Sequence, residues 1–216
     1  MSKIPNPPVS AYELVIASAN VGKLAELTEL LSDLPFRLFP QDALGVSAIE
    51  ETGHTFIENA LLKARHACLC TNKPALADDS GLIVDALQGA PGLYSARYAG
   101  AQRNDDANNA KLLEAMQHVP TPLRTARLYS VVVYMRHAYD PQPYVAEATW
   151  EGSITTTPQG RLGFGYNPVF LDPNLGLTVA QMDAQTRRRL SHRARAFAQL
   201  RERLVLLAQS TPVLSS

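Results

Sequence analysis

The chain has 216 residues, of which 46% are hydrophobic and 19% charged, enough for one α/β domain or two small lobes that share a core. Lys and Arg together number 20, as do Asp and Glu, which argues against a wide basic face for nucleic acid. No apolar run approaches the ~20 residues that span a bilayer, so no membrane partner is expected.

The N-terminal residues and the two cysteines indicate the cellular location of the protein. Residues 1–10, "MSKIPNPPVS", are polar and proline-rich and lack the apolar core of a signal peptide. Only Cys68 and Cys70 are present, and their spacing predicts neither a disulfide framework nor a zinc site. We therefore expect a reduced, cytoplasmic protein with a flexible extension over residues 1–10 and a single domain over residues 11–210.

Apolar periodicity and turn residues predict alternating strands and helices along this domain. Strands are expected at 12–17, 35–39 and 82–87, helices at 22–33, 55–70, about 105–117 and about 184–208, and a hairpin of two long strands at 125–136 and 144–156. Thr55 and Glu58 form a capping box for the second helix, and Asn104 can cap the third. The mixture predicts an α/β fold with a mixed sheet.

The segment "SANVGK" (18–23) lies between the first strand and the first helix, where a phosphate-binding loop would lie. It is not a Walker A loop, because Leu24 follows Lys23 in place of a hydroxyl residue and no glycine stands five residues before Gly22. If this turn binds phosphate, a metal must be held elsewhere.

Two acidic doublets, Glu50-Glu51 and Asp78-Asp79, are the candidates for a metal site. Asp78 and Asp79 follow an apolar strand and precede Ser80-Gly81, which predicts a turn. Two hypotheses remain open at about even odds. The doublet can form a solvated Asx turn, or one of its carboxylates can join Glu50 or Glu51 in holding magnesium, which prefers a few carboxylates together with substrate phosphates.

Basic residues suited to a polyanion stand near these motifs. Lys23 begins a helix, Lys63 lies on the second helix, and five arginines crowd the start of the last one. Each alone is more often a solvated surface charge. His192 and Arg193 are adjacent and follow Ser191, a possible hydroxyl ligand, although His192 can also be a core histidine.

Five segments together carry a family resemblance: "SANVGKLAEL", "ETGHTFIENALLKARHA", "ALADDSGLIVDALQGAPGLYSARYAG", "GFGYNPVF" and "SHRARA". In this order, over about residues 14–200, they resemble the inosine triphosphate pyrophosphatase family, the house-cleaning noncanonical purine nucleoside triphosphate pyrophosphatases. The resemblance implies a two-lobed α/β structure with an elongated mixed sheet and a substrate cleft between the lobes. It also implies a magnesium-dependent homodimer that hydrolyses ITP, dITP and XTP to nucleoside monophosphate and pyrophosphate.

By the same resemblance Asp79 is the general base, and magnesium is held by Glu50 and Asp79, helped by Glu51 or Asp78. The implied substrate-binding residues are Ser18, Ala19, Asn20, Val21, Gly22, Lys23, Lys63, Ser80, Phe164, Gly165, Tyr166, Asn167, Arg187, His192 and Arg193.

The chain departs from the family pattern at three places. Ser18-Ala19 replaces Thr-Gly, which requires φ below zero at Ala19. Arg187 replaces a lysine, which keeps the charge and changes its geometry. Asn167 replaces an aspartate beside the base. We expect activity to survive these changes and the selectivity between bases to be altered.

Two alternatives compete with this interpretation. A septum-inhibitor-like (Maf) nucleotide pyrophosphatase would act on modified pyrimidines or dTTP, but its distinguishing segments are absent. A non-catalytic nucleotide-binding protein could keep the pocket, although the presence of both Glu50 and Asp79 argues against it.

Overall fold

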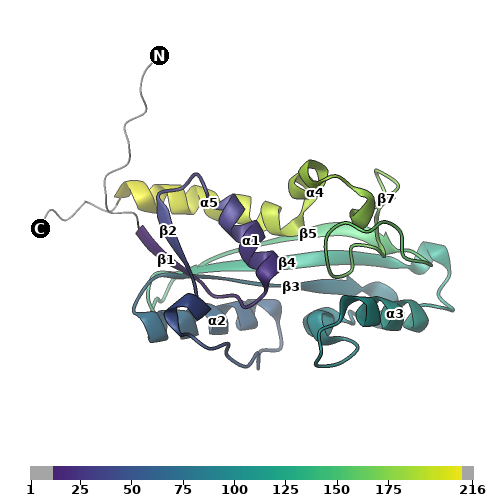
Figure 1. The fold of residues 1–216 in the computed structure, drawn as a ribbon, viewed down its shortest axis with the longest axis horizontal. Coiled ribbons are helices and arrows are strands. Elements are labelled where there is room, and N and C mark those ends of the chain that lie inside the picture. Colours follow the sequence, from purple (N-terminus) through teal and green to yellow (C-terminus); the bar gives the residue numbers. More distant parts are fainter. Residues whose placement is uncertain (1–11, 211–216) are drawn as a thin grey trace, which may run out of the picture.

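A computed structural model describes residues 12–210, which form a seven-stranded mixed sheet with helices on both faces (Figure 1). The strands, in sheet order β2-β1-β3-β4-β5-β6-β7, are Phe36–Pro40, Tyr12–Ile16, Ala75–Val84, Thr125–Met135, Tyr144–Ile154, Phe170–Asp172 and Leu177–Thr178. The α-helices are α1 (Val21–Leu30), α2 (Phe56–Thr71), α3 (Asp105–Ala115), α4 (Ala184–Leu190) and α5 (His192–Ser210). The extension predicted over residues 1–10 lies outside the described residues.

The sheet changes character at β3. Strand β1 pairs in parallel with both β2 and β3, whereas all pairs from β3 to β7 are antiparallel. The long strands β3, β4 and β5 form the central axis of the molecule (Figure 1). An α/β fold with a mixed sheet was predicted and is confirmed.

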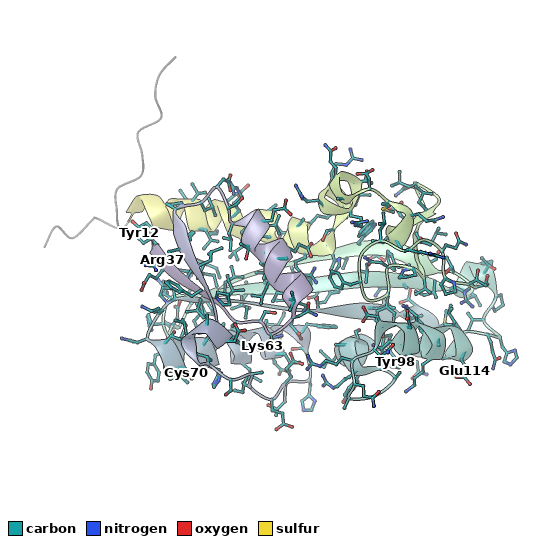
Figure 2. All side chains as sticks on the ribbon, in the orientation of Figure 1. Tyr12, Arg37, Lys63, Cys70, Tyr98 and Glu114 are labelled. Carbon is teal, nitrogen blue, oxygen red and sulfur yellow. The ribbon has the colours of Figure 1, made fainter. Side chains whose placement is uncertain are left out.

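The core consists of three apolar clusters. On one face, α2 packs against β3 and β4 around Ala64 and Val133. On the opposite face, α1 and α5 pack against the same part of the sheet around Leu27 and Phe197. The third cluster surrounds Trp150 at the other end of the strands and includes residues of α3. Helices α2, which carries Lys63 and Cys70, and α3 thus lie opposite α5 (Figure 2).

Local signals placed several elements correctly. Thr55 and Glu58 form the predicted capping box of α2, and Asn104 caps α3 through its side chain. The long hairpin β4–β5 is present. Cys68 is buried and Cys70 exposed, as two positions on different helix faces should be. No helix in the described range 12–210 is long and apolar enough to cross a membrane.

Two predicted elements were wrong. The turn expected at Ser80-Gly81 does not exist, because β3 runs unbroken from Ala75 to Val84. The strand predicted at 82–87 forms the end of β3 only as far as Val84, and Asp85–Leu87 form a 3-10 helix. Glycine is needed at position 81 for close approach: a Cβ there would lie 2.5 Å from the carbonyl oxygen of Gly92. The single final helix is divided at Ser191, whose Oγ accepts a hydrogen bond from the backbone N–H of Ala194 and so caps α5.

Candidate active site

A cavity of about 440 Å³ opens between α1, the middle of β3, the α4–α5 junction and the loop 163–167. Its size is typical of a pocket for a small molecule. Apolar side chains such as Leu128 and Trp150 form one wall, and Lys23, Arg193 and Ser80 contribute polar groups. The cavity therefore lies between two parts of the molecule. One contains α1, and the other contains the apolar cluster around Trp150.

The SANVGK segment forms the start of α1 beside this cavity. Asn20 caps the helix, since its Oδ1 accepts from the N–H of Lys23 at 3.0 Å, and the N–H of Asn20 donates to Ser18 Oγ at 3.3 Å. Positive φ occurs, among non-glycine residues of 12–210, at three positions that do not include Ala19, so the condition for alanine there is met. Ser18 is buried, and Val21 is 80% exposed.

Gly22 brings the loop 163–167 close to this segment. A Cβ on Gly22 would lie 3.3 Å from Phe164 Cε1, so the aromatic ring covers the first turn of α1. The two segments are 140 residues apart in sequence, and together they close one side of the cavity.

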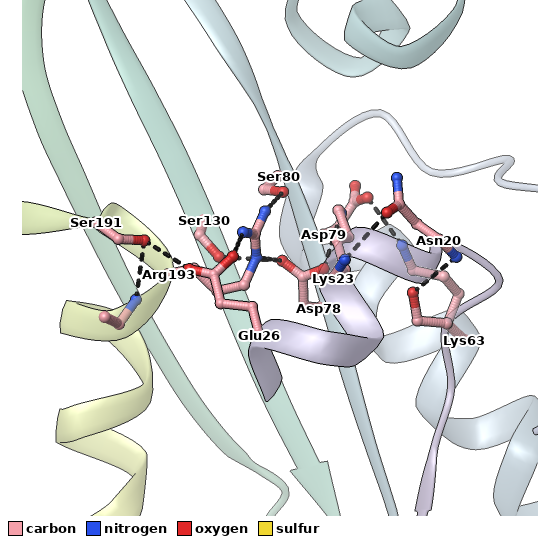
Figure 3. A network of polar contacts seen from close by, with 12 residues as sticks. Asn20, Lys23, Glu26, Lys63, Asp78, Asp79, Ser80, Ser130, Ser191 and Arg193 are labelled. Carbon is pink, nitrogen blue, oxygen red and sulfur yellow. Dashed lines mark hydrogen bonds and ion pairs between the residues drawn. The ribbon is translucent and has the colours of Figure 1, made fainter. Parts of the chain in front are cut away.

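The carboxylates of Asp78 and Asp79 are buried in the middle of β3, at 1% and 7% exposure. The hypothesis of a solvated turn is therefore wrong. Because successive side chains of a strand point to opposite faces, the two carboxylates have different neighbours. Asp78 faces α1 and α5, whereas Asp79 faces α2 (Figure 3).

Asp78 is held between two cations. Its Oδ1 lies 2.8 Å from Lys23 Nζ, and its Oδ2 accepts hydrogen bonds from Arg193 Nε at 3.1 Å and Ser130 Oγ at 3.2 Å (Figure 3). Burial acts to raise the pKa of Asp78, but Lys23 and Arg193 outweigh it and hold the pKa far below its usual value. Asp78 is thus a permanent anion that anchors both cations.

Asp79 belongs to a second cluster on the other side of the strand. Lys63 Nζ donates to Asp79 Oδ1 at 2.8 Å and to Glu51 Oε1 at 2.9 Å, and Arg97 lies 3.5 Å from Glu51 Oε2. Burial raises the pKa of Asp79 above its usual value, although Lys63 opposes the shift. Burial also acts to raise the pKa of Glu51, but Lys63 reverses that effect.

One side chain of the first acidic doublet reaches this cluster. Glu51 joins Asp79 through the Lys63 ammonium, whereas Glu50 is exposed and has no ion pair among the described residues. No group of three or more His, Cys, Asp or Glu side chains in the described chain could by itself hold a metal. Two carboxylates that share one cation nevertheless fit a divalent ion that takes its remaining ligands from phosphates and water.

Arg193 connects the α5 terminus to the rest of the pocket. Besides Asp78, it pairs with Glu26 on α1 and donates to Ser80 Oγ at 3.0 Å (Figure 3). Glu26 also accepts from Ser191 Oγ at 2.9 Å. Sequence reasoning missed Glu26, although its position three residues after Lys23 places both on one face of α1.

The remaining predicted residues line the cavity at the side of the loop 163–167. Tyr166 is buried and its hydroxyl donates to the carbonyl of Ser95 at 2.8 Å, while Phe164 is 45% exposed. Burial, reinforced by Arg193, lowers the pKa of His192 well below 6.5, so its ring is neutral at pH 7. Arg187 donates to the carbonyl of Met182 at 2.7 Å. Asn167 also borders the cavity.

The comparisons with known proteins agree with this geometry. The model of the Ham1 family matches residues 14–203. A dITP/XTP pyrophosphatase of Xanthomonas campestris pv. campestris (strain 8004) is 62% identical over 195 residues, which cover 90% of this chain and 98% of that protein.

Two solved structures are similar in fold and sequence. A HAM1 protein from Coxiella burnetii has a TM-score of 0.84 at 44% identity and covers 92% of this chain and all of its own. The Ham1 protein of Staphylococcus aureus has a TM-score of 0.80 at 36% identity with the same coverage. The chain belongs to the Ham1 family, and the resemblance carried by the five motifs is confirmed.

Lys23 provides a first test of the site. Replacing it by alanine should lower kcat/KM for ITP at least about tenfold, because a partly buried ammonium beside a helix N-terminus would support both a bound triphosphate and the charge that develops on the leaving group. Steady-state kinetics on the folded variant measure this. A kcat/KM equal to wild type would show that Lys23 serves only to neutralise Asp78.

Proposed function

We propose that this protein hydrolyses the noncanonical purine nucleoside triphosphates ITP, dITP and XTP to nucleoside monophosphate and pyrophosphate. The observation that carries the proposal is the buried pair Asp78 and Asp79, which directs one carboxylate to Lys23 and Arg193 and the other to Lys63. The names of the similar proteins, dITP/XTP pyrophosphatases among them, support the substrate class.

The cations of the pocket suit a triphosphate. Lys23 and Lys63 lie on either side of the doublet. Asn20 and Lys23, at the start of α1, line the cavity, whereas Lys63 is not among its lining residues. Arg187 lines the same cavity from α4. We assign these groups, with Ser18 to Gly22, to phosphate binding.

The donor set also fits magnesium. Asp79 and Glu51 would hold the ion, and Glu50, from the adjacent position, could reach it through water. Bound there, magnesium would neutralise phosphate charge and lower the pKa of coordinated water. Lys63, which now bridges the two carboxylates, would then be free to contact a phosphate oxygen.

Asp79 is assigned the role of general base. Its carboxylate accepts a proton from the attacking water, whose oxygen forms a bond to the α-phosphorus. The bond from that phosphorus to the α–β bridging oxygen breaks, and the electron pair leaves with pyrophosphate.

The purine is assigned to the loop 163–167 with His192 and Arg193. Hypoxanthine and xanthine present a 6-oxo acceptor and a protonated N1, whereas adenine presents a 6-amino donor. A site built on hydrogen bonds can discriminate by about 10⁴ because a mismatch leaves buried polar groups unpaired. Asn167 both donates and accepts, unlike an aspartate, so guanine with its extra 2-amino group should be rejected less strongly than adenine.

Measurement of kcat/KM for ITP, XTP, ATP and GTP tests this assignment. We expect strong preference for ITP and XTP over ATP, with weaker discrimination against GTP, and a changed GTP ratio in Asn167→Asp. Comparable values for ITP and ATP would refute the substrate class. An Asn167→Asp variant with the wild-type profile would remove only Asn167 from base recognition.

The same assay separates the alternatives. A Maf-like enzyme would prefer dTTP or modified pyrimidines, and a non-catalytic binder would release no pyrophosphate. Magnesium dependence, the homodimer and the cytoplasmic location stay predictions. Titration with magnesium and EDTA, and the mass of the protein in solution, test the first two.

A further inference from the structure

One face of α3 holds both polar backbone groups of Gly165 in the pocket loop. Asp105, the first residue of the helix, accepts from the Gly165 N–H through Oδ2 at 2.6 Å. Asn109, one turn later on the same face, donates from Nδ2 to the Gly165 carbonyl at 2.9 Å. A single helix therefore fixes the two peptide planes that flank this glycine.

The conformation of Gly165 needs such support. Its φ is +61°, in the left-handed region, and Gly163 two residues earlier has φ of +85°. A Cβ on Gly165 would meet nothing within 4 Å, so the glycine is required by backbone conformation and not by space. The loop lies outside the strands, and no sheet ladder fixes its peptide planes.

Asn109 lowers the stability of the fold more than a purely structural side chain would. It is 5% exposed, and its Oδ1 is buried without a hydrogen-bond partner among the described residues. A buried amide oxygen left unpaired costs about 1–3 kcal/mol, which an apolar side chain of similar size would avoid. An asparagine at this position, in spite of that cost, points to a requirement of the neighbouring site.

The hydrogen bonds of Asp105 and Asn109 to Gly165 leave the backbone N–H of Tyr166 available. It belongs to the same peptide plane as the Gly165 carbonyl, and in a trans peptide the two point in opposite directions. The bond from Asn109 therefore turns the Tyr166 N–H away from α3. This N–H has no hydrogen-bond partner in the part of the chain that the structure describes, and Tyr166 borders the cavity.

We propose that Asp105 and Asn109 are positioning residues that fix Gly165 and thereby aim the Tyr166 N–H at an oxo group of the bound purine. The inference rests on the proposed function. A fixed N–H donates a hydrogen bond to the 6-oxo group of hypoxanthine or xanthine, and it repels the 6-amino donor of adenine. Asp105 also borders the cavity, whereas Asn109 is buried behind the loop, and we assign the effect of both residues on selectivity to the backbone of Gly165.

The test is Asn109→Leu in the full chain, assayed with ITP and ATP. The ITP/ATP ratio of kcat/KM should fall about tenfold, mainly through a higher KM for ITP, with kcat within about twofold of wild type. The Tm should change little, because the unpaired Oδ1 is removed together with the hydrogen bond from Nδ2 to the Gly165 carbonyl. A merely structural role predicts the reverse, a lower Tm with an unchanged ratio.

Two further variants sharpen the test. Asp105→Asn keeps an acceptor for the Gly165 N–H and should keep the wild-type ITP/ATP ratio of kcat/KM. Asp105→Ala removes the acceptor and should lower this ratio, as Asn109→Leu does. Lys111→Met is the matched control, because Lys111 lies on α3 but donates to the carbonyl of Tyr98 and not to the loop. The ITP/ATP ratio of kcat/KM of Lys111→Met should equal that of wild type.

The outcomes separate the two proposals. If wild type prefers ITP and Asn109→Leu shows the same preference, the positioning role is wrong and the proposed function stands. An equal loss on ITP and ATP in Asn109→Leu also overturns the positioning role. If wild type itself does not discriminate between ITP and ATP, the proposed function fails, and this inference fails with it.

Discussion

Replacement of Asp79 by asparagine should lower kcat for ITP by about 10²–10⁴-fold, because the substitution keeps the shape of the side chain and removes the general base. Loss of a charged metal ligand should add to this effect. The measurement is single-turnover kinetics at saturating magnesium. A folded variant that retains more than about a third of wild-type kcat would refute the assignment of Asp79 as the general base, because the loss of a base has a much larger effect.

The same substitution should not destabilise the protein. The pKa of Asp79 is raised by burial, so its ionised form favours the unfolded chain, and a neutral amide removes that penalty. Lys63 keeps Glu51 as its partner. We expect the Tm of Asp79→Asn to equal or exceed that of wild type, which would separate lost catalysis from lost folding.

The assignment of Asp79 as general base also predicts how kcat/KM depends on pH. In wild type, kcat/KM should rise as pH increases through the pKa of Asp79, which lies above its ordinary value of 3.8. The ascending limb should disappear in Asp79→Asn. An unchanged limb would assign it to another group.

Asp78→Asn should have the opposite signature, a large loss of stability. Asp78 is buried between Lys23 and Arg193, and its replacement leaves two buried cations without a full counter-charge. Breaking such a pair from one side costs about 3–5 kcal/mol. Urea unfolding at pH 7 measures the loss, and a variant within about 0.5 kcal/mol of wild type, the range of ordinary surface changes, would contradict the role of Asp78 as an anchor.

The pH dependence of that loss follows from the sign of the shift. The pKa of Asp78 is depressed in the folded state, so its contribution is fully present above the unfolded pKa of about 3.9 and is lost as pH falls through the folded value. The stability gap between wild type and Asp78→Asn should be constant at neutral pH and narrow below about pH 4.

A second replacement supplies the control. Asp78→Leu combined with Arg193→Met removes the anion and one of its cations together. Because an apolar pair can replace a buried ion pair at little cost, the double variant should lose less stability than the sum of the two single variants.

The sequence predicted β1, β2, the hairpin β4–β5 and most helices because their signals are local, whereas the short strands β6 and β7 were not predicted. Apolar runs defined β1 and the hairpin, and the pairs that begin α2 and α3 are short-range caps. The turn at Ser80-Gly81 was wrong because glycine has two uses. It can make a turn, or it can admit a neighbouring backbone, here that of Gly92, and only the packed structure distinguishes them.

The site was predicted in outline through the five motifs, but its connections were not. Sequence alone left open whether Glu50 or Glu51 is the closer metal ligand, and it did not predict that Glu51 shares Lys63 with Asp79. The partners of Arg193 and of Gly165 lie 167 and 60 residues away, at Glu26 and Asp105. Such separations are set by tertiary packing, which no local pattern records.

The measurement that tests the central claim most directly is product analysis of ITP and ATP turnover with magnesium, in which pyrophosphate and orthophosphate are quantified separately. We predict one pyrophosphate and one IMP for each ITP consumed, and a kcat/KM for ATP lower by about 10⁴, the discrimination that hydrogen-bonded pockets reach. Release of orthophosphate with IDP, or equal turnover of ATP, would contradict the account.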